Sequence, residues 1–103
     1  MTWLQTRQQL TAERGEACEV CGMRAVDAHH VIKRLASKRK WLDVKENSVL
    51  LCRPCHNHAE AHARRSRRVF WKALCERYGR DYMVAWLDEL PMITKPLLSE
   101  LES

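Results

Sequence analysis

Long apolar runs are absent from this chain. No stretch of its 103 residues approaches the about 20 consecutive apolar residues that a membrane-spanning helix needs. Residues 1–10 also lack the apolar core of a secretory signal peptide. We therefore expect no membrane partner and predict a cytoplasmic location.

Internal repeats and low-complexity segments are missing as well. The composition is that of a globular protein, with 46% hydrophobic and 30% charged residues. A chain of 103 residues has room for one compact domain and little more, so we predict a single domain over residues 1–103. Because so small a domain buries a modest fraction of its surface, a structural metal would help to stabilise it.

Acidic residues are scarce in most of the chain. The formal net charge is +5, and 17 of the 18 lysine and arginine residues precede residue 81 with only 8 of the 13 acidic residues. A basic surface of this kind suits a polyanion such as a nucleic acid, although the same charges would also suit a soluble protein with a solvated surface. From residue 81 onward the balance is acidic.

The five cysteines are an odd number, which argues against a secreted disulfide framework and favours reduced thiols. Four of them form two Cys-x-x-Cys pairs separated by 30 residues, Cys18 with Cys21 and Cys52 with Cys55. A redox site would need one such pair, whereas four thiolates can close a tetrahedral Zn²⁺ site with no position left for water. We predict a structural zinc, and we interpret the remaining Cys75 as a small core residue.

The expected elements follow from capping residues and periodicity. Thr2 caps a helix that Gly15 ends, and Met83 begins an i, i+3, i+4, i+7 apolar pattern that Pro91 ends. Between them we predict strands over 25–32 and 48–51, a helix over 56–68 that continues or restarts over 69–78, and a last turn or frayed tail over 96–103. The predicted class is a small, mostly helical α+β fold.

Histidines and an asparagine lie between and just after the cysteine pairs. The pattern is Cys18-x-x-Cys21, Asp27-Ala-His29-His30, Asn47, then Leu51-Cys52-Arg-Pro-Cys55-His56. With the helix that follows, it covers residues 18–62 and resembles the HNH endonuclease family. The resemblance implies a ββα-metal core, which is a zinc-stapled β-hairpin packed on one helix around a divalent ion, with an N-terminal helix before it and a helical extension over 69–103.

The resemblance also implies a role for each of these residues. His29 and His56 would bind the catalytic metal, His30 would be the general base for the attacking water, and Asn47 would hold His30 in place through backbone bonds. Histidine suits a base because it titrates near neutral pH. Adjacent strand residues point to opposite faces, so a shared site for His29 and His30 requires the strand to end or bend at His30.

The remaining metal ligands stay open. Some family members have a second helix histidine where this chain has Glu60, which is either a ligand or a solvated charge. Asp27 shares the face of His29 and could orient a ligand or bind the metal. His58 and His62, four residues apart on another face of the helix, could bind a metal by themselves. His62 could instead support the ligands or face a phosphate, or both histidines could be exposed. Mg²⁺ or Mn²⁺ is the implied ion, while histidine ligands also suit Ni²⁺, Co²⁺ or Zn²⁺.

Two basic runs would flank such a site and contact DNA phosphates. They are Lys33, Arg34, Lys38, Arg39 and Lys40 after the first strand, and Arg64, Arg65, Arg67 and Arg68 in the helix. No base-reading element is evident, so the target sequence in double-stranded DNA is left open, as is the choice between monomer and homodimer.

The resulting expectation is a DNA phosphodiester hydrolase that leaves 5′-phosphate and 3′-hydroxyl ends, by nicking or by double-strand cleavage. A phage or mobile-element role is what the analogy with relatives of that family implies. The main alternative is a non-catalytic zinc-ribbon DNA-binding module, and a further one is a structural zinc protein that binds a partner through its acidic tail.

Overall fold

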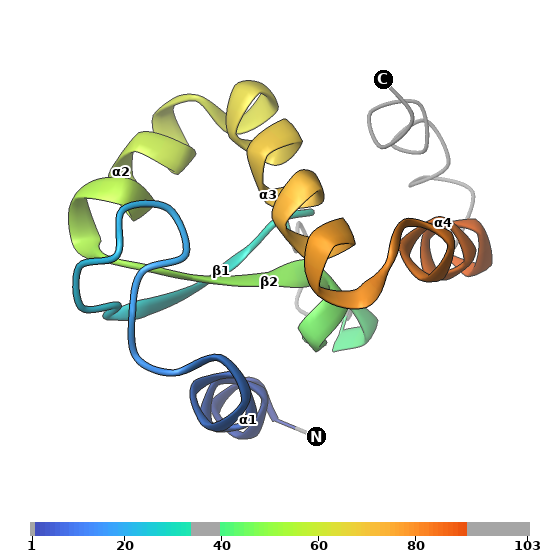
Figure 1. Ribbon diagram of the computed structural model, residues 1–103, viewed down its shortest axis with the longest axis horizontal. Coiled ribbons are helices and arrows are strands. Elements are labelled where there is room, and N and C mark those ends of the chain that lie inside the picture. Colours follow the sequence, from blue (N-terminus) through green and yellow to red (C-terminus); the bar gives the residue numbers. More distant parts are fainter. Residues whose placement is uncertain (1, 34–39, 91–103) are drawn as a thin grey trace. The chain divides into compact units, whose positions relative to one another are not determined.

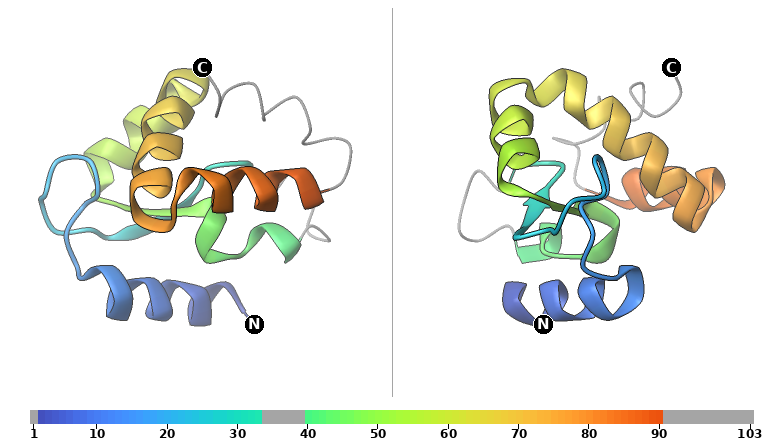
Figure 2. Two further views of the ribbon diagram at one scale, coloured as in Figure 1. Left: turned by 45° about the vertical axis from the view of Figure 1, so that its right-hand side comes forward. Right: turned by 60° about the vertical axis from the view of Figure 1, so that its left-hand side comes forward.

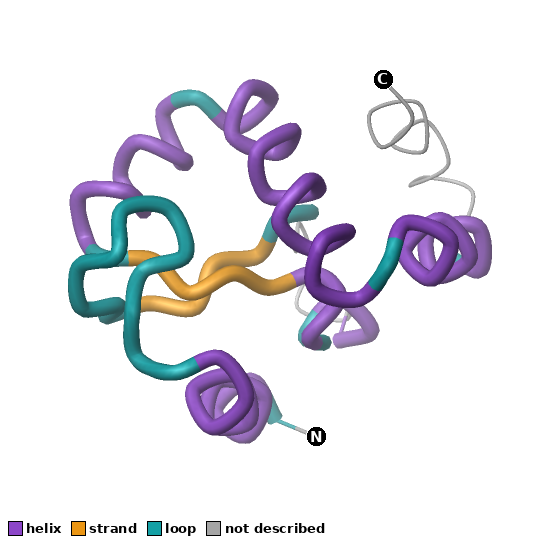
Figure 3. The backbone as a smooth tube through the Cα atoms, viewed as in Figure 1, coloured by secondary structure: helices purple, strands orange, loops and turns teal. Residues whose placement is uncertain are grey.

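The computed structural model describes residues 2–33 and 40–90, and this part is an α+β fold (Figures 1 and 3). It contains four α-helices, one antiparallel pair of strands and two short 3₁₀ turns, Lys40–Leu42 and Lys45–Asn47. In chain order the elements are α1 (Trp3–Arg14), β1 (Asp27–His30), β2 (Ser48–Leu51), α2 (Arg53–Ala61), α3 (Ala63–Tyr78) and α4 (Arg80–Glu89). The predicted α+β class is confirmed.

The chain divides into two compact units, Met1–Ala63 and Arg64–Ser103. The first unit holds α1, both strands and α2, and the second holds nearly all of α3 and α4. Every candidate ligand named from the sequence lies in the first unit. The single domain over residues 1–103 stays a prediction.

Helix α1 begins and ends where the sequence predicts. The Thr2 hydroxyl accepts from the backbone N–H of Gln5 at 3.1 Å, and the Gln5 side chain accepts from the Thr2 N–H at 2.8 Å. This reciprocal capping box satisfies two N–H groups that the first turn would otherwise leave unpaired. At the other end Gly15 has φ +86°, a conformation that favours glycine, and its N–H donates to Thr11 O.

Strands β1 and β2 form a hairpin in which Asp27 pairs with Leu51 and His30 pairs with Ser48. The predicted second strand, 48–51, is confirmed, whereas β1 is shorter than the predicted 25–32. Its ladder stops after His30 because the backbone N–H groups of the next two residues bond to Asn47 instead. Helices α1 and α2 lie on opposite sides of this hairpin (Figures 1 and 2).

The helix predicted over 56–68 is interrupted. Helix α2 starts at Arg53, with Cys52 at its N-cap, and ends at Ala61. His62 has φ −129° and ψ 53°, which lies outside the helical region, so the hydrogen-bond ladder breaks there and α3 starts afresh at Ala63. A continuous helix through His62 is therefore wrong.

Helices α3 and α4 supply the buried side chains of the second unit. Phe70, Trp71 and Leu74 on α3 are almost fully buried, as are Met83 and Leu87 on α4, at the expected helical spacing. Gly79, at φ +97°, separates the two helices. The predicted amphipathic helix is confirmed and ends at Glu89, just before Pro91. Pro91 itself and the expected tail over 96–103 lie outside the described residues.

Cys75 on α3 is half-buried, and burial raises the pKa of its thiol.

In the part of the chain that is described, no helix is long and apolar enough to cross a membrane.

Candidate functional site

The four paired cysteines converge as their spacing predicts. Their Sγ atoms all lie within 4.8 Å of one another, and the set is Cys18, Cys21, Cys52 and Cys55. Cys21 Sγ lies 3.5 Å from Cys52 Sγ. Cys18 and Cys52 are buried, while Cys21 is exposed. Four convergent sulfurs could hold a metal ion, and the set would tie the turn after α1 to the start of α2.

Backbone geometry around Cys18 favours its thiolate. Gly22, at φ +81°, turns the chain so that its N–H donates to Cys18 O at 3.0 Å. Burial opposes ionisation of the Cys18 thiol, but hydrogen bonds from the backbone of Cys21, Cys52 and Val20 outweigh it and lower its pKa to about 6. The thiolate is the form that binds a metal.

A second cluster lies between β1 and α2. His29 comes from the strand, and His56 and Glu60 lie one turn apart on the helix. Glu60 Oε1 is 3.5 Å from His29 Nδ1 and 3.4 Å from His56 Nε2, and the three ligand atoms lie within 4.8 Å of one another. Two ligands of one ion at about 2.1 Å each lie about 3.0 to 3.4 Å apart, so this donor set fits a divalent metal.

Asp27 lies beside this cluster. Its Oδ2 is 3.1 Å from His56 Nδ1 and 3.2 Å from Arg53 Nη1. Because a carboxylate only accepts, it favours the His56 tautomer with the proton on Nδ1, which leaves the Nε2 lone pair facing Glu60. Of the three ligands left open by the sequence, Glu60 joins the two histidines and Asp27 orients one of them.

The third open candidate, His62, is not part of the cluster. Its ring lies 4.6 Å from that of His58, and both side chains are exposed. Among the residues that the structure describes, this pair has no third metal-ligating side chain close enough to complete a site.

No family model, curated protein or solved structure matches this chain.

The His29 imidazole is held in its neutral form. Only 7% of its side chain is exposed. Burial, and then the nearby His56, lower the pKa of His29 from 6.5 to about 4. At neutral pH its imidazole therefore keeps the lone pair that metal binding requires.

This lowered pKa predicts an acid-sensitive fold in metal-free buffer. Between pH 6.5 and about 4, His29 is protonated in the unfolded chain but not in the folded chain. The free energy of unfolding therefore loses nothing to this group above pH 6.5 and falls as the pH drops through this window. The expected loss reaches about 3 kcal/mol, measured by urea unfolding at a series of pH values. A His29→Asn variant isolates the effect because it has every other titrating group of the wild type. Equal pH slopes in both proteins would contradict the assignment.

His30 projects from the other face of β1. Its Nε2 lies 2.7 Å from Asp43 Oδ1, and its ring stacks on Trp3 of α1 with centroids 3.9 Å apart and planes 16° apart. The strand ends at His30, as a shared site would require, yet the two neighbouring histidines face opposite helices. Sequence reasoning did not identify Asp43 or Trp3, although an acid inside a basic connection was a possible signal.

Asn47 makes the backbone bonds that the family resemblance implies. Its fully buried side chain accepts from Ile32 N at 2.7 Å and donates to Ile32 O at 3.1 Å and to Leu42 O at 3.0 Å. These bonds hold together the two ends of the connection between the strands. Its catalytic importance stays a prediction.

The basic residues are only partly located with respect to the site. Lys33 Nζ lies 3.2 Å from Glu60 Oε2 at a solvent-exposed edge of the cluster. Arg34, Lys38 and Arg39 lie outside the described residues, and Lys40 begins a 3₁₀ turn. The arginines at 64, 65, 67 and 68 belong to α3, in the second unit, and do not extend α2 as expected.

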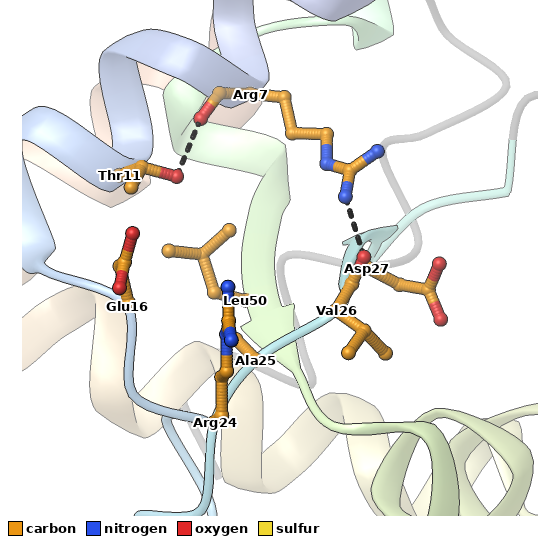
Figure 4. A pocket seen from close by; sticks show the side chains of 8 residues that line it. All are labelled: Arg7, Thr11, Glu16, Arg24, Ala25, Val26, Asp27 and Leu50. Carbon is orange, nitrogen blue, oxygen red and sulfur yellow. Dashed lines mark hydrogen bonds between the residues drawn. The ribbon is translucent and has the colours of Figure 1, made fainter.

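A separate cavity of about 170 Å³ opens near α1 (Figure 4). Its lining includes Arg7, whose guanidinium donates to Val26 O, together with Glu16 and Arg24. His29, His56 and Glu60 do not line it, and Asp27 is the one lining residue that also contacts their cluster.

Proposed function

We propose that this protein is a divalent-metal-dependent endonuclease of the HNH type that hydrolyses phosphodiester bonds in double-stranded DNA. In this proposal β1, β2 and α2 form the ββα-metal core, and the four cysteines bind a structural Zn²⁺. The observation that carries it is the convergence of His29 and His56 with Glu60 within 4.8 Å. The family resemblance, which rests on the sequence alone, implies the same role for these two histidines.

The metal would be held by His29, His56 and Glu60. When bound, such an ion supplies Lewis-acid stabilisation of the charge that develops on the phosphate and on the leaving 3′ oxygen. Asp27 keeps His56 in the tautomer that can bind it, and burial keeps His29 neutral. Two imidazoles and one carboxylate suit Mn²⁺ and the later transition metals as well as Mg²⁺.

His30 is the proposed general base. Within residues 2–33 and 40–90, β1 pairs with β2 alone, so its other edge is free of strand partners. A phosphodiester that crosses this edge could reach the metal ligands on one face and His30 on the other. His30 would take the proton of the attacking water as the new P–O bond forms and the bond to the 3′ oxygen breaks.

The charges beside the cluster of His29, His56 and Glu60 suit a phosphate. Lys33 lies at the solvent side of Glu60, and Arg53 lies next to Asp27 with 63% of its side chain exposed. Both can contact backbone phosphates without reading the sequence, in line with the net charge of +5.

Plasmid cleavage by two matched variants of α2 tests the proposal. The wild type should nick or linearise supercoiled plasmid with Mg²⁺ or Mn²⁺ and not with a chelator. His56→Ala should slow cleavage by on the order of 100-fold or more, because metal assistance contributes several kcal/mol. His58→Ala removes an exposed histidine from the same helix and should leave the rate unchanged.

The competing results are distinct. Cleavage that persists in chelator, or that His56→Ala leaves intact, would sink the proposed mechanism. Plasmid binding without any cleavage would favour a non-catalytic zinc module, which leaves the cluster of His29, His56 and Glu60 without a role. Zinc content measured on each variant shows whether the cysteine site has survived the substitution.

A further inference from the structure

Two side chains, a carboxylate and an indole, contact the imidazole of His30. Asp43 Oδ1 lies 2.7 Å from Nε2, and only 5% of the Asp43 side chain is exposed. The Trp3 ring covers one face of the imidazole, at a centroid separation of 3.9 Å. The partners of His30 therefore come from the first turn of α1 and from the connection before β2, far apart in sequence.

Asp43 is itself held from both sides. Its backbone carbonyl accepts from the Thr6 hydroxyl at 2.9 Å, and Thr6 is fully buried. The carbonyl of the preceding residue, Leu42, accepts from the Asn47 side chain at 3.0 Å. The carboxylate therefore sits on a segment that two buried side chains fix in place, and it is pre-positioned for the imidazole.

The contact decides which nitrogen of a neutral His30 carries its proton. A carboxylate accepts and cannot donate, so Nε2 must be the donor and Nδ1 must hold the lone pair. Within the described ranges, Nδ1 has no hydrogen-bond partner. The stack on Trp3 restricts rotation of the ring about its bond to the strand.

We propose that Asp43 and Trp3 are positioning residues that hold His30 as its Nε2–H tautomer and present Nδ1 as the proton acceptor. The inference rests on the proposed endonuclease function, in which His30 is the base. It gives α1, which lies outside the hairpin-and-helix core, a part in catalysis. It also separates the two neighbouring histidines by task, because carboxylates on opposite faces of β1 orient different rings: Asp43 orients His30, and Asp27 orients His56.

The tautomer can be read directly by NMR of ring-labelled histidine in the full chain. The five histidines give few signals, and a His30→Gln variant assigns the one from His30. In the neutral form of the ring, we expect the wild type to carry the proton on Nε2. In Asp43→Asn an amide can donate instead, and the proton should shift toward Nδ1. Trp3→Leu should leave the tautomer unchanged.

Kinetics give the second measurement. Asp43→Asn should lower kcat on the order of 100-fold or more while KM changes less than about 3-fold, since the loss falls on proton transfer and not on DNA binding. Trp3→Leu should lower kcat about tenfold. Asp81→Asn makes the same substitution at an exposed residue of α4 and should change neither constant.

The two proposals fail in different ways. A wild-type His30 with its proton on Nδ1, or a tautomer that Asp43→Asn does not change, overturns the positioning role whether or not DNA is cleaved. A wild type with the expected tautomer but no metal-dependent cleavage overturns the endonuclease and leaves the orientation of His30 by Asp43 standing. An unchanged kcat in Asp43→Asn, with the tautomer shifted, would show that His30 is not the base.

Discussion

Replacing Cys52 with alanine is expected to remove stoichiometric zinc from the protein and to unfold the part of the chain that contains α1, the hairpin and α2. Cys52 is buried, follows β2 directly and forms the N-cap of α2. Zinc binding to sites of this type contributes about 10 to 16 kcal/mol, whereas small domains are stable by about 5 to 15 kcal/mol. Loss of one of four thiolates should therefore leave too little free energy to keep this unit folded.

Metal analysis of the purified protein and urea unfolding followed by circular dichroism provide the measurement. Cys75→Ala is the matched control, because Cys75 is half-buried on α3 and is not one of the four clustered cysteines. That variant should keep the zinc and lose at most a few kcal/mol through the small cavity left behind. Wild-type protein that is fully folded without zinc would contradict the structural role of this site.

Replacing Arg14 with methionine is expected to destabilise the protein by about 3 to 5 kcal/mol. The Arg14 side chain is 1% exposed, and its Nη1 donates to Glu19 Oε2 at 3.0 Å and to Ser48 O at 2.7 Å. Its Nη2 donates to Lys45 O at 3.1 Å. Methionine fills much of the same space but strands a nearly buried carboxylate and two carbonyl groups.

The position of Arg14 explains why so much depends on it. The same Glu19 oxygen accepts from Leu50 N at 2.6 Å, so this pair connects the end of α1 to the cysteine turn and to β2. Urea unfolding should show the loss, and Arg7→Met tests the same substitution on the same helix. Arg7 is exposed, and among the described residues its guanidinium donates to Val26 O, so its replacement should cost less than about 1 kcal/mol.

A double variant separates the two causes of this destabilisation. Adding Glu19→Gln to Arg14→Met removes the uncompensated negative charge, and we expect it to recover part of the lost stability. If the double variant is less stable than Arg14→Met alone, the charge of Glu19 is not the source of the cost.

Local features of the sequence were enough to predict the frame of the candidate site. The bounds of α1 follow from Thr2, Gln5 and Gly15, each of which acts within one helical turn. The convergence of the four cysteines follows from metal chemistry, because four thiolates can bind one tetrahedral ion only when the two pairs lie close together. The position of β2 follows from a short apolar run that ends at a cysteine.

The break at His62 was not predictable from such local patterns. Residues 56–68 contain no proline or glycine, so periodicity alone predicts one helix through both basic and histidine-rich parts. The conformation of a single residue divides them and assigns the four arginines at 64, 65, 67 and 68 to another helix and another unit.

The sequence by itself determined which functional groups are present, namely four thiolates, paired histidines, and carboxylates near them in the chain. Only the tertiary structure decided which of these groups meet. The rotation of α2 about its axis brings Glu60 to His29, and the packing of α1 brings Trp3 to His30. The fixed connection before β2 brings Asp43 to the same ring. These contacts join residues far apart in the chain, and they depend on how the elements pack against one another and not on any pattern along the chain.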